Sequence, residues 1–209
     1  MANADMNRLM DHARIRLPGA LDAAIQMELF AVMNEFFQSS NIWYEDIQFP
    51  VQPTADSYLD NPDAYTYDVI PTQGTITRLM GVVDSKGLPI KAYMPTLGQA
   101  VLNFSPNTAD TYTARVALTV SDPVTRDGYP EFPDWIMDKY GNDILDGVLA
   151  RMMAQIAKPY SSPQMAQYHM RLFKQSVAQA KVEASHQNVY RGQNWRFPQT
   201  FARRRFVKF

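Results

Sequence analysis

The spacing of apolar residues changes twice along the chain, and this constrains the fold more than any other sequence feature. In residues 18–37, apolar side chains recur every three or four positions, which places them on one face of a helix. These side chains are Leu21, Ile25, Leu29, Val32 and Phe36. From Trp43 the spacing falls to two, the period of a strand, and beyond residue 131 the helical period returns. The sequence therefore predicts an α+β fold with a β segment inserted between helical segments.

The inserted segment is predicted to be an antiparallel β lobe. Its expected strands are residues 43–51, 65–69, 75–83, 88–93, 99–104 and 112–120. The alternation is clearest in 112–120, where Tyr112 and Val116 face one way and Arg115 the other. Between 75–83 and 88–93, a turn ending in Gly87 indicates a hairpin, because glycine adopts positive φ without steric penalty.

Three further helices are predicted after residue 131. The expected ranges are 133–140, ended by Gly141 and Asn142, then 143–157, and finally 163–184 after the Ser162-Pro163 start signal. The last helix is predicted to bury Met165, His169 or Tyr168, Leu172, Phe173, Val177 and Ala180.

The predicted organisation has four parts. They are an N-terminal helical part (1–42), the inserted β lobe (43–130), a C-terminal helical hairpin (131–186) and an extended arm (187–209). The expected fold class is therefore α+β: a bundle of long helices with an inserted antiparallel β lobe and an extended C-terminal arm.

The formal net charge of −1 conceals a strong asymmetry along the chain. Residues 1–150 hold 9 basic and 20 acidic side chains, whereas residues 151–209 hold 11 basic side chains and one acid, Glu183. The two parts carry net charges of −11 and +10. A near-neutral total argues against a basic nucleic-acid-binding protein, but a split of this size is typical of an interaction tail.

Residues 187–209 combine basic and aromatic side chains without a helical or strand period. The candidate binding residues are Tyr190, Arg191, Trp195, Arg196, Phe197, Phe201, Arg203, Arg204, Arg205, Phe206 and Phe209. Tyr, Trp, Phe and Arg are the residue types that anchor protein interfaces. Fully extended, such a segment spans roughly 75 Å, which favours docking into a neighbouring subunit. Two alternatives remain: single-stranded nucleic acid, bound by stacking and phosphate contacts, or the acidic surface of the same chain.

No catalytic or metal-binding motif is found, so the sequence predicts a protein without enzymatic activity, cofactor or metal. The chain has no cysteine, which excludes disulfides and thiol chemistry. Its three histidines, His12, His169 and His186, lack helical pair spacing, and His169 is interpreted as a partly buried packing residue. Neither a signal peptide nor a membrane span is predicted.

Two groups of carboxylates have residue types that could form a site. Glu28 and Glu35 are seven residues apart and share a helix face. Two exposed glutamates are a commoner arrangement on a helix than an acid–base pair, so no catalytic pair is predicted. The aspartates at positions 56, 60, 63 and 68 lack the spacing of a calcium loop, so no calcium site is predicted.

Several short strings resemble the head-to-tail adaptor, or connector, proteins of tailed bacteriophages, especially short-tailed ones. They are residues 13–20 (ARIRLPGA), 34–37 (NEFF), 40–43 (SNIW), 151–155 (RMMAQ) and 158–166 (KPYSSPQMA), followed by a long helix and an Arg/Phe-rich tail. The likeness covers the helical parts, somewhat over half of the chain, and leaves the β lobe aside.

The resemblance implies a virion structural protein at the head–tail junction, made in the host cytoplasm. Such adaptors form a dodecameric ring that binds the portal above and a tail or nozzle protein below, and DNA passes through it without specific binding. On this sequence the portal-gripping arm is 187–209. Trp195, Phe197, Phe206 and Phe209 are its expected apolar anchors, and Arg191, Arg196 and 203–205 are expected to pair with portal carboxylates.

The charge split fits such a ring. The acidic part of one subunit is expected to face the basic hairpin or arm of its neighbour, since complementary heterologous contacts close by rotation. The nucleic-acid-binding interpretation of the Arg/aromatic tail stays open as the alternative function.

Overall fold

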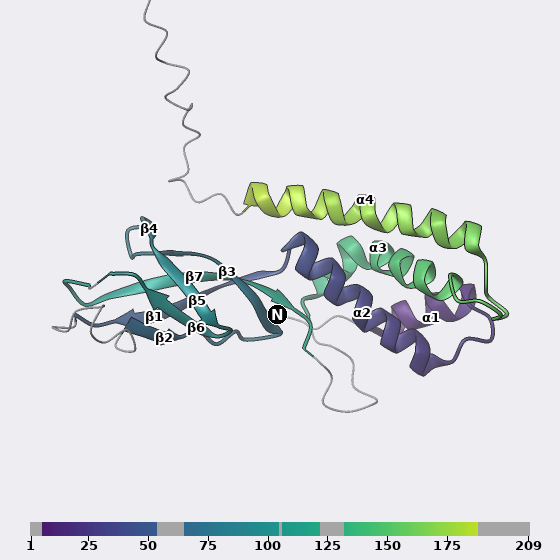
Figure 1. Ribbon diagram of the computed structural model, residues 1–209, viewed down its shortest axis with the longest axis horizontal. Helices are drawn as coiled ribbons and strands as arrows, with labels where there is room; N and C mark the ends of the chain where they lie inside the picture. Colours follow the sequence, from purple (N-terminus) through teal and green to yellow (C-terminus); the bar gives the residue numbers. More distant parts are fainter. Residues whose placement is uncertain (1–5, 54–64, 105, 122–131, 188–209) are drawn as a thin grey trace, which may run out of the picture.

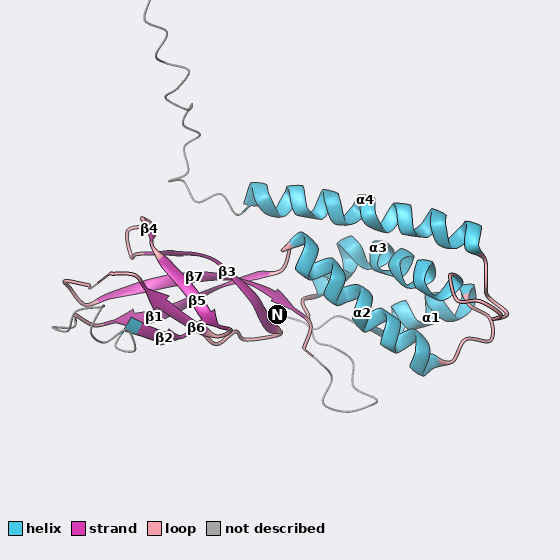
Figure 2. Ribbon diagram, in the orientation of Figure 1, coloured by secondary structure: helices cyan, strands magenta, loops and turns pink. Residues whose placement is uncertain are grey.

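The computed structural model describes residues 6–53, 65–104, 106–121 and 132–187. The described chain forms a helical lobe and a β lobe that lie end to end along the long axis of the molecule (Figure 1). The first two helices precede the β lobe in sequence and the last two follow it, so the helical lobe is assembled from both ends of the described chain (Figure 2).

The helical lobe contains α1 (Met6–Arg16), α2 (Asp22–Ser40), α3 (Asp134–Met153) and α4 (Pro163–Gln187). Both α2 and α3 pack against each of the other helices, and the contact between α3 and α4 is the most extensive. The core face of α2 holds the predicted residues Ile25, Leu29, Val32 and Phe36, all buried. Leu21, predicted on the same face, is exposed, because it precedes the helix as its N-cap residue. The helix ends at Ser40, where Asn41 adopts a left-handed conformation (φ 52°) and its N–H donates to the carbonyl of Phe37.

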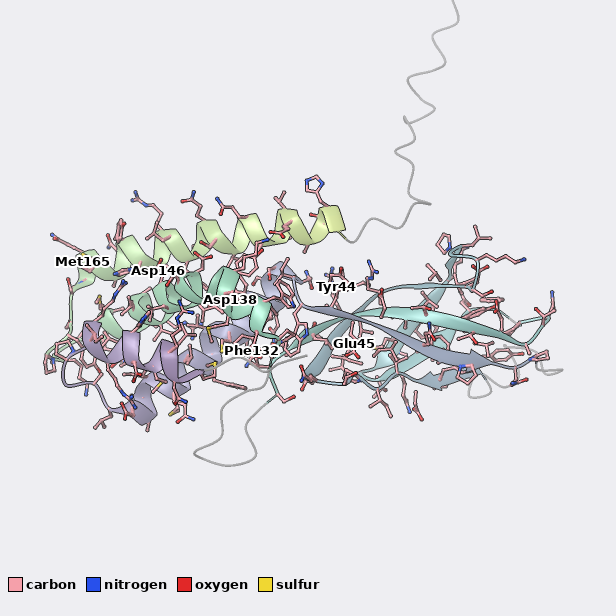
Figure 3. All side chains as sticks on the ribbon, turned by 180° about the vertical axis from the view of Figure 1, so that it is seen from behind. Tyr44, Glu45, Phe132, Asp138, Asp146 and Met165 are labelled. Carbon is pink, nitrogen blue, oxygen red and sulfur yellow. The ribbon has the colours of Figure 1, made fainter. Side chains whose placement is uncertain are left out.

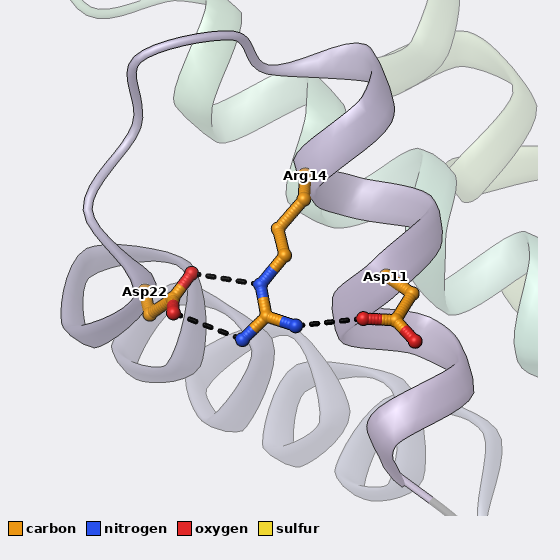
Figure 4. A network of polar contacts seen from close by, with 3 residues as sticks. All are labelled: Asp11, Arg14 and Asp22. Atoms are coloured by element: carbon orange, nitrogen blue, oxygen red, sulfur yellow. Dashed lines mark hydrogen bonds and ion pairs between the residues drawn. The ribbon is translucent and has the colours of Figure 1, made fainter.

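An exposed arginine joins the first two helices (Figure 4). The Arg14 guanidinium makes a bidentate contact with Asp22, with Nε–Oδ1 and Nη2–Oδ2 distances of 2.9 Å, and its Nη1 lies 2.6 Å from Asp11 Oδ1. Hydrogen bonding to Arg14 lowers the pKa of Asp22. Because the groups are exposed, the contact contributes little to stability.

The β lobe holds two antiparallel sheets. The first has the order β1 (Tyr44–Val51), β7 (Asp110–Thr119), β3 (Thr75–Val83) and β4 (Pro89–Ile90). The second has the order β2 (Thr66–Asp68), β6 (Gln99–Leu102) and β5 (Ala92–Thr96). The chain passes from the first sheet to the second at Lys91. Aromatic rings fill the space between the sheets: Phe49 of β1 lies 5.2 Å from the ring of Tyr67 in β2 and 6.2 Å from that of Tyr112.

The two lobes share one hydrophobic core. At their junction the ring of Phe37 from α2 lies 5.4 Å from Trp43 and 6.0 Å from Phe132, all three buried. The hydroxyl of Thr119 in β7 donates to Asn34 Oδ1 of α2 at 2.6 Å. The contacts therefore continue without a break from the helices into the first sheet.

The predicted fold class is corrected by these elements. The molecule is α+β, but the expected bundle of long helices is wrong, because the helices have 11, 19, 20 and 25 residues. The helix predicted over 18–37 begins at Asp22 rather than Pro18, because Leu17-Pro18-Gly19 forms a turn in which Gly19 has a φ of 81°. Within the N-terminal helical part, the separate helix α1 was not predicted. At the other end, the loop from Ala154 to Ser162 separates α3 from α4.

Several local predictions can also be compared with the structure. Strand β3 has the predicted bounds, and α4 begins at the predicted Pro163. The predicted break at Gly141 is wrong, because α3 runs continuously through it. His169, Phe173 and Ala180 are buried as expected, whereas Met165 and Tyr168 are exposed.

Candidate functional site

The helical hairpin of α3 and α4 is held together by polar contacts, one of which is made by Asp146, labelled in Figure 3. His169 is buried, and its Nδ1 lies 2.9 Å from Asp146 Oδ1. One turn closer to the start of α3, Asp143 Oδ1 accepts a hydrogen bond of 2.6 Å from the Ser176 hydroxyl. Buried and half-buried polar groups that are paired in this way favour one register between two helices, because sliding leaves them without partners.

The C-terminal end of α4 is attached to the N-terminal end of α3 through Glu183. The phenol of Tyr140 donates to Glu183 Oε2 at 2.8 Å, and Lys139 pairs with the other carboxylate oxygen. Burial, together with donation to Glu183, raises the pKa of Tyr140. Ala180 and Ala184 are buried against α3. The only acid of residues 151–209 therefore holds the last turns of α4, at the point where the basic segment follows.

At Gly147, the backbone of α3 lies very close to side chains of both α2 and α4. A Cβ atom added there would lie 2.5 Å from Val32 Cγ1 of α2 and 2.8 Å from Phe173 Cδ2 of α4. These distances are well inside van der Waals contact, so the position takes only glycine without displacing a neighbouring helix.

Arg151 lies between Glu28 and Glu35, the two glutamates that share a face of α2. Its Nη2 lies 2.5 Å from Glu35 Oε2 and its Nη1 lies 3.5 Å from Glu28 Oε2. The two glutamates, which share a face of α2 as the sequence predicted, are therefore bound by one guanidinium of α3. This contact stabilises the packing of α2 against α3 through a partly exposed ion-pair network.

A groove of about 540 Å³ lies on one side of the hairpin, near its connecting loop. Its lining is mostly apolar, from Ala150, Ala154, Ala166 and Met170, among others. Two exposed cations, Arg171 and Lys174, complete the lining, and Lys181 continues the same basic stripe two turns further along α4. No carboxylate among the described residues forms an ion pair with any of these three cations.

The opposite end of α3 exposes an aromatic side chain beside acids. Trp135 is 42% exposed, and Asp138 lies one turn further along the helix on the same side. Asp134, four residues before Asp138, extends this acidic cluster. Neither aspartate takes part in an ion pair within the described part of the chain.

The remaining features of the described chain do not form a recognisable catalytic or metal-binding arrangement. In the β lobe, open depressions of about 400 and 640 Å³ lie beside β5, and Tyr93 lines both. Within the described ranges, no three His, Asp or Glu side chains are grouped so that they could hold a metal ion. None of the described helices has an apolar stretch long enough to cross a bilayer. Of the aspartates at positions 56, 60, 63 and 68, only Asp68 lies in the described chain, at the exposed end of β2.

The predicted binding residues of the arm lie outside the described residues, which end at Gln187. The structure therefore places none of Tyr190, Arg191, Trp195, Arg196, Phe197, Phe201, Arg203, Arg204, Arg205, Phe206 or Phe209. The residues that the sequence analysis missed are Trp135 and Asp138 of α3 and the groove residues of the hairpin. Their signal was present as an aromatic beside two acids at helical spacing, but exposure had to be known before it could be interpreted.

Comparison of the sequence with protein-family models and with curated proteins finds no match.

Proposed function

We propose that this protein is a head-to-tail adaptor of a short-tailed bacteriophage, a virion structural protein that forms a ring between the portal and the tail or nozzle. The ring is dodecameric in the adaptors that the sequence resembles, and DNA leaves the head through it. The C-terminal arm, residues 187–209, binds the portal. The strings at 13–20, 34–37 and 158–166 and the interleaved basic and aromatic residues of the arm support this proposal.

One observation carries the proposal: the attachment of the base of the arm. Tyr140 and Lys139 hold Glu183, and Ala180 and Ala184 are buried, so the last turns of α4 have a defined position on the helical lobe. A binding segment with a fixed origin loses less orientational freedom when it docks than one that follows a loose helix end. A C-terminal segment attached to a fixed helix end is what an adaptor needs in order to hold a portal above it.

The charge of the segment supports a protein partner with carboxylates. Residues 188–209 contain six basic side chains and no acid. Arg pairs with carboxylates in bidentate geometry, and aromatic side chains add buried area to such contacts. The proposed portal surface is therefore acidic with apolar pockets.

The decisive experiment compares the full chain with a chain that ends at Gln187. Each is mixed with the cognate portal, and complexes are examined by electron microscopy and by sedimentation. We expect a ring of the full chain on the portal and no complex of the shortened chain. Because the contacts of Glu183 with Tyr140 and the burial of Ala180 and Ala184 are kept in the shortened chain, circular dichroism is expected to show that both chains retain α4.

Two variants of the full chain refine this test. Replacing Arg203, Arg204 and Arg205 by Gln removes three charges of the arm, whereas replacing Arg78, Lys86 and Lys91 by Gln removes three exposed charges of the β lobe. We expect the first variant to weaken portal binding at least about tenfold and the second to leave it nearly unchanged.

Two results would overturn the proposal. The first is a shortened chain that still binds the portal, and the second is a full chain that does not. Tight binding of the full chain to single-stranded DNA or RNA, with a steep dependence on salt that disappears when residues 188–209 are removed, establishes the nucleic-acid-binding alternative instead.

A further inference from the structure

We propose that copies of this chain associate head to tail through two surfaces of the hairpin. The first is the α3 knob, formed by Asp134, Trp135 and Asp138. The second is the hairpin groove, lined by Ala150, Ala154, Ala166 and Met170 together with Arg171 and Lys174. The knob of one copy enters the groove of the next. This inference rests on the proposed ring and names the contact that forms it.

The α3 knob has the composition of an interface anchor. Trp135 is 42% exposed although it belongs to a helix whose other large side chains are mostly buried. An exposed tryptophan is costly to solvate and provides a large area when it is covered. Asp134 and Asp138 flank it, and neither has an ion-pair partner within the described part of the chain.

The hairpin groove is complementary to the α3 knob in apolar character and in charge. Its lining includes three alanines, whose small side chains leave an open volume of about 540 Å³ at the surface of α3 and α4. Arg171 and Lys174 at its border are exposed, and the described residues of the same chain offer them no carboxylate. An apolar groove with a positive border therefore suits an aromatic side chain flanked by acids.

Charge also argues against the arm of the same chain as the occupant. Residues 188–209 carry six basic side chains and no acid, so their approach to Arg171 and Lys174 brings like charges together. The α3 knob brings the opposite charge. A second copy of this chain is thus the occupant that the charges favour.

The positions of the two surfaces determine the kind of assembly. Trp135 lies in the first turn of α3, whereas Ala150 lies about four turns later, roughly 22 Å along the helix axis. Figure 3 shows Asp138 toward the β lobe and Met165, at the start of α4, at the far end of the helical lobe. One copy can therefore use both surfaces at once. Such a heterologous contact repeats from copy to copy and closes into a ring when its rotation permits.

The absence of native cysteine makes this contact directly testable by disulfide trapping. Asn142→Cys places a thiol one turn beyond Asp138 on the exposed side of α3, and Gln167→Cys places one in the groove. Neither change alters a charge. The two single-cysteine full-length proteins are mixed, oxidised and analysed by non-reducing electrophoresis and mass spectrometry. We expect a mixed disulfide dimer in clear excess over the same-variant dimers, because a disulfide needs Cα atoms within about 7 Å.

The matched control is Gln175→Cys, another exposed glutamine of α4 that does not line the groove. Its mixture with Asn142→Cys is expected to give at least about tenfold less mixed dimer. Adding Trp135→Ala to the Asn142→Cys protein is expected to reduce trapping with Gln167→Cys by a similar factor.

Charge reversal gives a second readout. Asp138→Lys in the Asn142→Cys protein and Lys174→Asp in the Gln167→Cys protein should each lower the yield, and the combination of both should restore it. Mixed dimers no more abundant than with Gln175→Cys, or a yield indifferent to these reversals, would overturn the knob-and-groove contact. The proposed function is judged separately, by the wild-type ring on the portal, so a ring that forms without this trapping refutes only the contact.

Discussion

Two glycines of α3 show how strongly the surroundings decide the effect of a single methyl group. At Gly147, an added Cβ would meet Val32 and Phe173 from two other helices at 2.5 and 2.8 Å. We predict that Gly147→Ala lowers the free energy of unfolding by about 1–3 kcal/mol, because overpacking outweighs the gain in helix propensity. Urea denaturation followed by circular dichroism measures the change.

The control is Gly141→Ala in the same helix. There the nearest atom is the flexible Met137 side chain at 3.0 Å, and Leu9 lies at 3.8 Å. This variant is expected to be neutral or up to about 1 kcal/mol more stable. Equal effects at the two positions would contradict the close approach of three helices at Gly147.

A tyrosine gives the protein a predicted sensitivity to alkaline pH. Burial and donation to Glu183 raise the pKa of Tyr140 in the folded state. Stability from this group is fully present below the unfolded pKa of about 10 and is lost as pH rises toward the folded pKa, because the unfolded chain releases the proton first. We therefore predict that the free energy of unfolding falls as pH increases above about 10.

Tyr140→Phe provides the comparison for this prediction. It removes the ionisable group and keeps the ring that packs 5.3 Å from Phe36. The variant is expected to show a shallower loss of stability above pH 10 in urea titrations, although Tyr67 and Tyr112, whose pKa values are also raised by burial, retain part of it. An identical slope in both proteins would show that Tyr140 does not contribute.

At the scale of elements, α3 and α4 depend on polar pairs that the apolar pattern does not reveal. We predict that Asp146→Ala lowers the free energy of unfolding by about 1–3 kcal/mol, because it leaves the buried imidazole of His169 without its partner. Denaturation in urea at neutral pH measures this. Asp138→Ala, an exposed aspartate of the same helix, should change stability by less than about 0.5 kcal/mol. A comparable loss at Asp138 would contradict the role of the buried pair.

Element boundaries were the least predictable part of the fold. The strands followed from alternation, and β3 has the predicted bounds, but Gly141 and Asn142 were interpreted as the end of a helix. In the structure Gly141 is buried in the middle of α3 beside Leu9 of α1. Tertiary packing overrode the low helix propensity of glycine, and α1, which supplies that packing, was itself missed.

At the scale of the whole molecule, the shared core predicts that the two lobes unfold together. Phe37 of α2 contacts both Trp43 and Phe132 at the junction. We predict that Phe37→Ala lowers the free energy of unfolding by about 3–5 kcal/mol and that hydrogen exchange measured by mass spectrometry rises in both β7 and α3. Leu88→Ala, at an exposed turn of the β lobe, serves as the control. Faster exchange in α3 alone would show that the lobes are separate folding units.

The sequence by itself determined the α+β class, the inserted antiparallel strands and the charge split, because periodicity and charge are local properties of the chain. It could not determine the lengths of the helices, since these depend on which turns find partners. Only the tertiary structure brought Glu183 to Tyr140, enclosed Gly147 between two helices and left Trp135 and the hairpin groove exposed. These contacts join residues far apart in the chain, and their energies arise from burial and geometry that no local pattern contains.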